Sequence, residues 1–357
     1  MFRFNIKYQT ITIEGGIYLP DAFRGKGIPA FASNSDFHYE LYLFLKDWFS
    51  RSPFLKVKTS GSIGEPKEML VEKSRMMQSA QLTCSFLELK EGDKALLCMS
   101  LDYIAGKMMV VRALVAGLDI YLVPPSGHPL RDTTISFDFA AMIPMQVYNS
   151  LQSDKERNRL IGIKNLIIGG GAIDPQLSNQ LKDFPNNIYS TYGMTETLSH
   201  IALRKINGKD ATENYIPFPS VNISLSQEGA LIIDAPLVNS EKLYTNDIAE
   251  IAVDGNFRIL GRKDNIINSG GVKIQIEEVE KLLKPYIDVP YAITSQPDPK
   301  FGEIVVLVVE KDIDVSIFKD KLPEYYYPKN IITVDVIPIT ETGKIKRHRL
   351  KELIANK

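Results

Sequence analysis

The stretch KTSGSIGEPK (58–67) places small hydroxyl side chains and glycines between two lysines. Hydroxyls, an ammonium group and backbone N–H groups can together bind phosphate oxygens, which glycine allows to approach closely. The residues that supply these groups are Thr59, Ser60, Gly61, Ser62, Gly64 and Lys67. This is not the common P-loop, because that loop needs GxxxxGK[ST] opening into a helix, whereas FLKVK and KEMLVE on either side alternate like strands. The stretch predicts either a phosphate-binding loop or an ordinary polar hairpin.

The octapeptide STYGMTET (190–197) brings an aromatic ring, a glycine, hydroxyls and the carboxylate of Glu196 together after a strand-like run. A carboxylate can hold Mg²⁺ through oxygen, as phosphate chemistry often requires. The alternative is a polar junction between a strand and a helix.

Two further stretches carry charged residues that phosphate chemistry could use. Asp247 and Arg262 lie in YTNDIAEI and RILGRKD, where a surface ion pair is the alternative. Lys344 follows a glycine in PITETGKIKRHRL, where the alternative is a solvated basic tail.

Composition excludes several classes of function. The net charge is −1, with Lys+Arg 42 against Asp+Glu 43, which gives no electrostatic case for nucleic acid as a partner. The two cysteines, Cys84 and Cys98, form no CxxC pair, which excludes a disulfide framework and fits a reducing compartment. No signal peptide and no apolar run of about 20 residues is present. We therefore expect a soluble, cytoplasmic protein without membrane insertion.

The elements that must position these residues alternate between strand and helix, which favours an α/β fold. Strand-like runs include ALLCMS, IYLVPP, NLIIGG and EIVVLVV, and the N-terminal residues 1–16 also alternate. Apolar periodicity predicts helices over 40–49 and 74–87. Towards the C-terminus the sequence predicts a hairpin turned at Asp254-Gly255, a glycine turn at 269–271 and a helix over 277–283. With 357 residues, two domains are expected, and their boundary is predicted near 262–264.

Taken together and in this order, TSGSIGEPK, YGMTET, the TxD segment, GRKDNIINSGG and TGKIKR resemble the motifs of the adenylate-forming superfamily of acyl- and aryl-CoA synthetases. The resemblance implies a large N-terminal domain of βαβ layers over 1–262 and a small, mobile C-terminal α+β lid over 263–357. It also implies an active site between them. In such enzymes a carboxylate attacks the α-phosphate of ATP to give an acyl-adenylate, which the thiol of coenzyme A then attacks.

The resemblance also implies roles for individual residues. Tyr192 would stack on adenine, Asp247 would accept from the ribose hydroxyls with support from Arg262, and Thr195 would contact the α-phosphate. Glu196 would hold Mg²⁺, and Lys344 would bridge the ribose and the reacting phosphate. The lid would turn about Asp264. The backbone beside the nucleotide would come from Gly170, Gly171, Ala172 and Gly193, and the path of the thiol from Ser269, Gly270 and Gly271.

Several local stretches are most similar to o-succinylbenzoate–CoA ligases of menaquinone biosynthesis, among them YGMTETLSHI and GRKDNIINSGGVKIQIEEVE. A substrate with a second carboxylate needs a cation or donors for it, because an unpaired buried charge is costly. The candidates are Arg112, Lys107, Thr197 and Ser199. For both basic residues the alternative is a surface side chain whose stem lies along the protein.

Two departures from the family pattern stand out. Ile63 replaces a hydroxyl residue in the phosphate loop, and the region before that loop is much shorter, which predicts a trimmed fold that relies on a homodimer. The alternatives in function are another acyl- or aryl-CoA ligase, a carrier-loading adenylation domain and a non-catalytic nucleotide-binding remnant. The second would expect a fused carrier, and the sequence ends at Lys357. Intact Lys67, Glu196 and Lys344 argue against the third.

Overall fold

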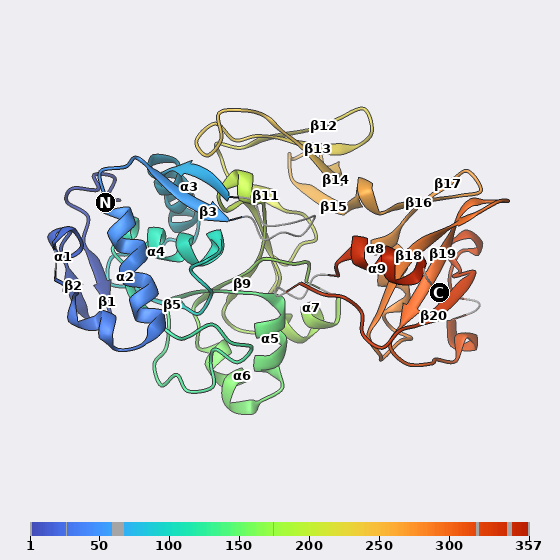
Figure 1. The fold of residues 1–357 in the computed structure, drawn as a ribbon, viewed down its shortest axis with the longest axis horizontal. Helices are drawn as coiled ribbons and strands as arrows, with labels where there is room; N and C mark the ends of the chain where they lie inside the picture. The colour runs from blue at the N-terminus through green and yellow to red at the C-terminus, as the bar shows by residue number, and fades with distance from the viewer. Residues whose placement is uncertain are drawn as a thin grey trace. The chain divides into compact units, whose positions relative to one another are not determined.

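The computed structural model describes residues 2–25, 27–58, 68–173, 175–318, 321–340 and 345–355. Their contacts divide them into two compact units (Figure 1). One unit holds the residues before 223 together with 234–242, and the other holds 223–233 and the residues after 242. The contacts thus group residues 243–262 with the C-terminal part. The functional boundary after Arg262 stays a prediction.

A nine-stranded sheet forms the centre of the first unit. Its strands from edge to edge are β11 (Ile216–Pro217), β10 (His200–Lys205), β9 (Asn187–Gly193), β8 (Asn165–Ile168), β7 (Phe139–Met142), β5 (Lys94–Leu97), β6 (Asp119–Leu122), β1 (Ile11–Ile13) and β2 (Gly16–Tyr18). The strands from β9 to β1 are parallel, whereas β2, β10 and β11 join antiparallel. Every residue of β7 and β8 is buried, as expected of parallel strands covered on both faces.

Helices connect these strands, and a separate two-stranded hairpin precedes α3. The helices are α1 (Asp21–Arg24), η1 (Ala30–Ser33), α2 (Asp36–Trp48), α3 (Lys73–Phe86), α4 (Ile104–Ala116), α5 (Pro144–Leu151), α6 (Asp154–Ile161), α7 (Pro175–Leu181) and η2 (Thr195–Thr197). The hairpin pairs β3 (Phe54–Lys58) with β4 (Glu68–Glu72). This pairing confirms that the glycine-rich stretch 59–67 joins two strands.

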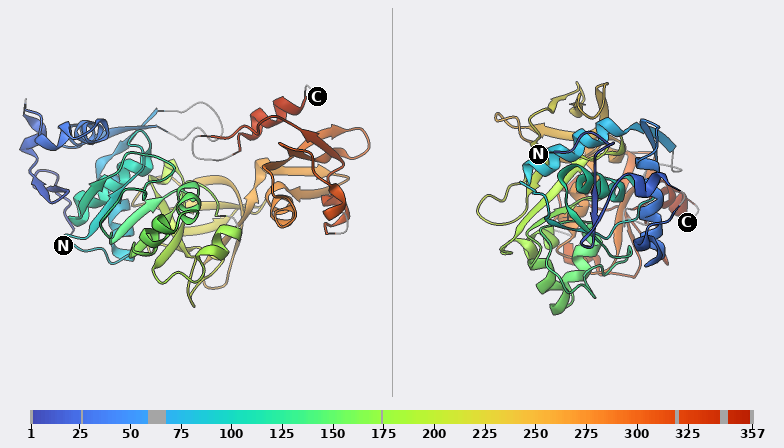
Figure 2. Two further views of the ribbon diagram at one scale, coloured as in Figure 1. Left: turned by 90° about the horizontal axis from the view of Figure 1, so that it is seen from below. Right: turned by 90° about the vertical axis from the view of Figure 1, so that its left-hand side faces the viewer.

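The N-terminal residues differ from their predicted single strand. Between residues 2 and 18, which the structure describes, only Ile11–Ile13 and Gly16–Tyr18 form strands, at the edge of the sheet beside α1 and α2 (Figures 1 and 2). The carboxamide oxygen of Asn5 accepts from the backbone N–H of Lys7 at 3.1 Å. Such a local bond folds the backbone into a turn in place of a strand.

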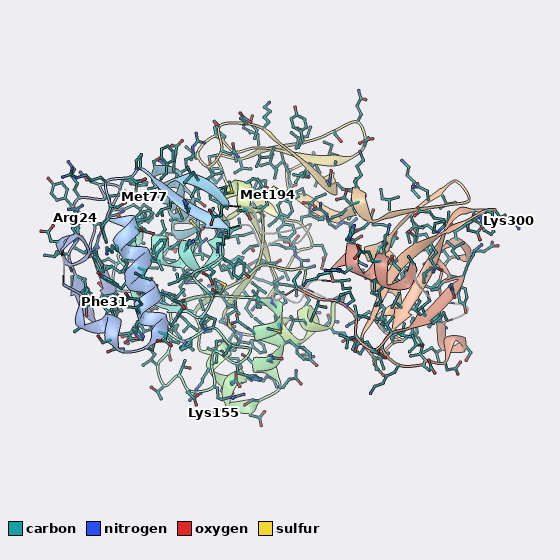
Figure 3. The ribbon with its side chains drawn as sticks, viewed as in Figure 1. Arg24, Phe31, Met77, Lys155, Met194 and Lys300 are labelled. Carbon is teal, nitrogen blue, oxygen red and sulfur yellow. The ribbon has the colours of Figure 1, made fainter. Side chains whose placement is uncertain are left out.

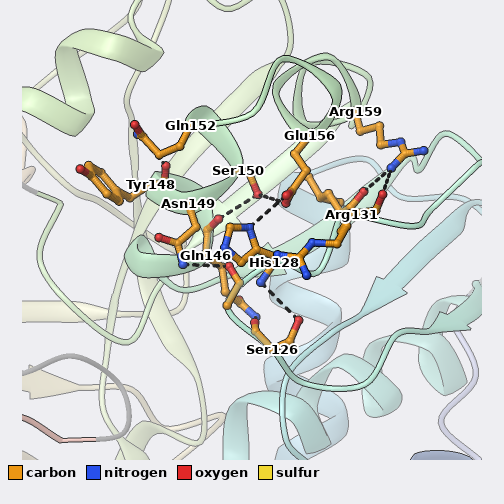
Figure 4. Close-up of polar contacts among 12 residues, drawn as sticks. Ser126, His128, Arg131, Gln146, Tyr148, Asn149, Ser150, Gln152, Glu156 and Arg159 are labelled. Carbon is orange, nitrogen blue, oxygen red and sulfur yellow. Dashed lines mark hydrogen bonds and ion pairs between the residues drawn. The ribbon is translucent and has the colours of Figure 1, made fainter.

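The long connection between β6 and β7 is held against α5 and α6 by polar contacts (Figure 4). Nδ1 of His128 lies 2.9 Å from Oε1 of Glu156, whose side chain is buried. Gln146 donates to the carbonyl oxygens of Cys98 at 3.1 Å and Ser126 at 2.9 Å. A buried carboxylate needs such partners, so this connection is part of the core packing of the unit.

The second unit contains two sheets. The four-stranded sheet runs in the order β12 (Asn222–Leu225), β13 (Ala230–Asp234), β14 (Leu243–Ile251) and β15 (Phe257–Arg262). The five-stranded sheet contains β17 (Val272–Gln275), β16 (Ile266–Ser269), β19 (Gly302–Val309), β18 (Tyr291–Asp298) and β20 (Asn330–Thr333). The helices are η3 (Lys263–Asn265), α8 (Ile276–Leu283), η4 (Val315–Phe318), η5 (Glu324–Tyr326) and α9 (Arg347–Ala355). The hairpin at Asp254-Gly255, the glycine turn and the helix beginning near Glu277 are confirmed.

Cys84 and Cys98 are free and buried, and burial raises the pKa of each thiol to about 12. Across the described residues, no helix combines the length and the apolar character that spanning a bilayer demands.

Candidate active site

Tyr192 and the GGGA run (169–172) lie at the carboxyl ends of two neighbouring strands of the nine-stranded sheet. The parallel strands β8 and β9 are neighbours, with Ile168 opposite Ser190. Gly169 to Ala172 follow the end of β8, and Tyr192 and Gly193 end β9. Ligands of open α/β sheets bind at the carboxyl ends of parallel strands. The structure thus brings two of the predicted nucleotide-binding segments together.

The glycine after Tyr192 is required by the close approach of β9 and β10. A Cβ on Gly193 would lie 2.3 Å from the carbonyl oxygen of Ser199 and 2.5 Å from Cα of His200. Both neighbours are backbone and cannot move aside. Gly193 therefore allows the chain after Tyr192 to lie against β10.

Tyr215 holds the ring of Tyr192 in place, a role that no sequence motif indicated. The two ring centroids are 5.7 Å apart with an interplanar angle of 53°. The hydroxyl of Tyr215 lies 2.9 Å from Oγ of Ser190 on the same strand as Tyr192. The Tyr192 ring is thus positioned from outside its own strand.

The one-turn helix η2 contains Thr195, Glu196 and Thr197. Glu196 is exposed, and its backbone carbonyl accepts from the carboxamide of Asn239 at 3.1 Å. The hydroxyl of Thr197 is buried, lying 2.9 Å from the N–H of Met194 and 2.6 Å from the carbonyl oxygen of Ser199. In this structure Thr197 therefore bonds to the backbone of the turn.

The residue after η2, Leu198, has a φ of +64°. This left-handed conformation is unfavourable for leucine and costs on the order of 1–3 kcal/mol. The side chain of Leu198 is buried. Packing and the bonds of Thr197 thus hold a strained turn that carries the chain from Glu196 to Ser199.

A buried arginine lies beside this turn. Arg112, on α4, is 2% exposed, and its Nη2 donates to Oγ of Ser199 at 2.6 Å. Its Nε is also buried and has no hydrogen-bond partner among the described residues. Burial lowers the pKa of Arg112 to about 10, so the group is still charged at neutral pH. The surface alternative for Arg112 is therefore wrong.

Two further buried polar groups complete the surroundings of Arg112. Nδ1 of His200 lies 3.3 Å from Oγ of Ser199, and its Nε2 lies 3.0 Å from Oγ1 of Thr83. Burial, and then the charge of Arg112, lower the pKa of His200 well below its usual range. His200 is thus neutral at pH 7 and can share hydrogen bonds without adding a second charge.

Lys107 lies elsewhere on α4. It is half-buried, and its Nζ donates to the carbonyl oxygen of Lys56 on β3 at 3.2 Å. Burial is the main cause that lowers the pKa of Lys107. The structure therefore brings Arg112 and Ser199 together and places Lys107 against the hairpin.

In the second unit, Asp247 on β14 and Arg262 on β15 are cross-strand partners. Nη1 of Arg262 lies 2.9 Å from Oδ1 of Asp247, and Nη2 lies 2.9 Å from Oδ2 of Asp264. Burial acts to lower the pKa of Arg262, but the bond to Asp264 and the charges of both carboxylates outweigh it and raise that pKa. The predicted pair is thus part of a three-residue ion network.

The turn from Ser269 to Gly271 joins β16 to β17. Gly270 and Gly271 have φ values of +59° and +85°, the combination that tight hairpin turns need. The N–H of Gly270 donates to the carbonyl oxygen of Phe301 at 2.8 Å. Lys300, labelled in Figure 3, has its Nζ 5.0 Å from the centroid of the Phe301 ring.

The remaining predicted site residues lie outside the described residues. They are the loop residues Thr59, Ser60, Gly61, Ser62, Ile63, Gly64 and Lys67, and the tail residue Lys344. The strands β3 and β4 flank the loop, and an antiparallel bridge between Ile339 and Ile345 flanks Lys344.

Comparison with known proteins identifies relatives over most of the chain. A 2-succinylbenzoate–CoA ligase from Listeria monocytogenes is 26% identical over 97% of this chain and 80% of its own length. One from Escherichia coli is 29% identical over 83% of this chain and 68% of its own length.

A solved structure from Dyadobacter fermentans, described as an acyl-CoA synthetase (AMP-forming)/AMP-acid ligase II-like protein, is 30% identical. It superposes with a TM-score of 0.63 over 90% of this chain and 95% of its own. The AMP-binding enzyme family matches residues 55–238, more than half of the sequence. These matches confirm the resemblance that the motifs showed, and the chain belongs to the family of AMP-binding enzymes.

Proposed function

We propose that this AMP-binding enzyme is an AMP-forming acid–CoA ligase and that its acid is o-succinylbenzoate. The observation that carries the choice of acid is the buried guanidinium of Arg112. No carboxylate contacts it among the described residues, and its Nε has no partner there. Two relatives that carry the name 2-succinylbenzoate–CoA ligase support the same choice.

The proposed reaction has two halves. The carboxylate of the acid attacks the α-phosphate of ATP, forming a phosphorus–oxygen bond and releasing pyrophosphate. The thiol of coenzyme A then attacks the acyl carbon of the adenylate, and AMP leaves. No protein nucleophile is needed, so the residues act by positioning the reactants and stabilising developing charge.

The proposed nucleotide contacts follow the family roles. The ring of Tyr192 stacks on adenine, and the carboxylate of Asp247 accepts from the ribose hydroxyls. Thr195 and the loop 59–67 contact phosphate oxygens, and Lys344 approaches the α-phosphate. In the second half-reaction the thiol passes the turn formed by Ser269, Gly270 and Gly271.

Magnesium fits this donor set through Glu196. Among the residues that the structure describes, no three His, Cys, Asp or Glu side chains cluster as a metal site. Mg²⁺ commonly uses only one or two carboxylates, together with waters and substrate phosphates. The exposed carboxylate of Glu196 suits that mode, in which the cation would neutralise charge on the phosphates.

The acid is proposed to bind with its second carboxylate against Arg112 and Ser199. A guanidinium can donate two parallel hydrogen bonds to one carboxylate. Such a pair would provide the unpartnered Nε with an acceptor and neutralise the buried charge. Neutral His200 supports Ser199 from the other side.

The decisive experiment measures AMP release that depends on ATP and coenzyme A across a panel of carboxylic acids. The panel includes o-succinylbenzoate and, as its matched control, 4-oxo-4-phenylbutanoate, which lacks only the ring carboxylate. We expect kcat/KM for o-succinylbenzoate to be at least about 30-fold higher, since losing one partner of a buried charge pair costs about 2 kcal/mol or more. Equal kcat/KM values for the two acids would show that the enzyme does not recognise the second carboxylate. Strong preference for a different acid would identify another acid–CoA ligase.

A further inference from the structure

The two sheets of the second unit are joined by a three-residue connector. The last strand of the four-stranded sheet, β15, ends at Arg262, and the first strand of the five-stranded sheet, β16, begins at Ile266. Between them lie only Lys263, Asp264 and Asn265, in the single turn η3. A change in the backbone dihedrals of so short a connector would alter the path of the chain into β16.

The carboxylate of Asp264 is held from the four-stranded sheet. Nδ2 of Asn246, on β14, donates to Asp264 and lies 3.1 Å from each of its carboxylate oxygens. Nη2 of Arg262 donates to Oδ2 at 2.9 Å. Asn246 immediately precedes Asp247 on β14. The residue that bonds to the connector and the residue that carries the proposed ribose-binding carboxylate are therefore neighbours on one strand.

The other side of the connector is held by residues of β17 and α8. Nδ2 of Asn265 lies 2.5 Å from Oε1 of Glu277 at the start of α8. Nε2 of Gln275 donates to the carbonyl oxygen of Arg262 at 2.7 Å and to Oε2 of Glu277 at 2.7 Å. The connector is therefore bonded to both sheets by side chains.

The contacts of Asp264 lie at the surface of the unit. Its side chain is 48% exposed, that of Arg262 is 33% exposed, and Asn246 is exposed. Exposed polar contacts contribute little to folding stability. Such contacts are suited to selecting between two backbone arrangements of similar energy.

We propose that Asn246 is a positioning residue that holds Asp264, and with it the connector, in one of the two arrangements that the ligase uses in turn. This inference rests on the proposed two-step function. Arg262 bonds to Asp247 with one nitrogen and to Asp264 with the other. A nucleotide that engages Asp247 would therefore also bias the connector.

The first test is hydrogen exchange, which needs no activity. We expect Asn246→Ala to speed amide exchange across 260–268 by about three- to tenfold, the range for losing one ordinary intramolecular hydrogen bond. The matched control is Asn256→Ala, which removes a 2.7 Å bond to Asp254 in the hairpin turn of the same sheet. It should leave exchange across 260–268 unchanged. Unchanged exchange in Asn246→Ala would overturn the proposal.

The second test measures the two half-reactions separately, as pyrophosphate release and as thioester formation from supplied acyl-adenylate. Asn246→Ala should change the ratio of the two rates by about three- to tenfold, as for hydrogen exchange, whereas Asn256→Ala should leave the ratio unchanged. In an Asp264→Ala background, Asn246→Ala should have no further effect, because its partner is already gone. Equal slowing of both halves, or full additivity of the two substitutions, would contradict the role. A wild-type enzyme that released no AMP with any acid would instead refute the proposed function, and the exchange result would still decide the role of Asn246.

Discussion

Arg112 is a buried charge that no carboxylate contacts among the described residues. A charged group without a counter-charge is unfavourable in a protein interior. Arg112 is nevertheless only 2% exposed, and its guanidinium lies beside the hydroxyl of Ser199, which in turn contacts the neutral imidazole of His200. Perturbed charged groups of this kind are concentrated at functional sites. The unfavourable free energy of this buried charge in the free enzyme is understandable if the substrate supplies the missing negative charge.

Arg112→Met, which roughly preserves volume, should therefore separate binding from folding. We expect KM for o-succinylbenzoate to rise at least about 30-fold, with KM for ATP nearly unchanged. The melting temperature of the free enzyme should not fall, since replacing an unpaired buried charge by an apolar group is neutral or stabilising. Steady-state kinetics and thermal unfolding measure both effects.

The matched control is Arg204 on β10, a buried arginine whose Nε also has no partner among the described residues but whose Nη1 pairs with Glu213 at 2.6 Å. Arg204→Met should lower stability and leave KM for the acid unchanged. If Arg112→Met raised both Michaelis constants alike, Arg112 would lie outside the acid pocket.

At the scale of elements, Lys73 ties the β3–β4 hairpin to α2. It follows β4 and begins α3, and its Nζ donates to the carbonyl oxygen of Asp47 near the end of α2 at 2.8 Å. A positive charge is favourable at the C-terminus of a helix. Burial nevertheless lowers the pKa of Lys73 to about 8, although the charge of Asp47 acts to raise it.

This lowered pKa predicts a pH dependence of stability. Between about pH 8 and pH 10.5 the unfolded chain binds the Lys73 proton more tightly than the folded chain, so unfolding becomes less favourable as pH rises. Relative to Lys73→Met, the wild type should gain about 2 kcal/mol of unfolding free energy between pH 7.5 and pH 10. Urea denaturation of both proteins at several pH values measures the difference. If the unfolding free energies of the two proteins changed with pH in parallel, the lowered pKa of Lys73 would be wrong.

Local signals made several elements predictable from sequence. Alternation predicted β3 and β4, Asp254-Gly255 predicted the β14–β15 hairpin, and paired glycines predicted the turn after Ser269, all as observed. The predicted helix over 40–49 began too late, because Ser35 caps it by accepting from the N–H of His38. That cap signal was present in the sequence.

The surroundings of the site could not be predicted in the same way. Thr83 and His200 meet across 117 positions of sequence, and Tyr215 reaches Ser190 from outside any motif. These residue types are common at core and loop positions, so the sequence alone does not mark them as part of a site. They come together only because of the order of the strands in the sheet. Motifs indicate the groups that touch substrate, whereas the residues that support those groups depend on tertiary packing.

At the scale of the whole molecule, adenine-binding and ribose-binding candidates belong to different compact units. Tyr192 and Glu196 lie in the first unit, and Asp247 and Arg262 in the second. The proposed chemistry needs contributions from both in the first half-reaction, whereas thiol attack needs the turn at Ser269–Gly271. We propose that the lid implied by the resemblance turns near Asp264, so that different residues serve the two half-reactions.

Lys344 provides the sharpest test of that lid. In the proposed mechanism its charge stabilises the α-phosphate and the leaving pyrophosphate, and loss of such a donor typically costs about 10²–10³ in rate. Lys344→Ala should therefore suppress pyrophosphate release by that order, while thioester formation from supplied acyl-adenylate remains nearly intact. Gly271→Leu should do the reverse, because its φ of +85° strains a branched side chain and the side chain would obstruct the thiol. Rapid-quench assays of each half-reaction measure both. If Lys344→Ala slowed the two halves equally, this lysine would serve both steps from one position, and the rotating lid would be wrong for this protein.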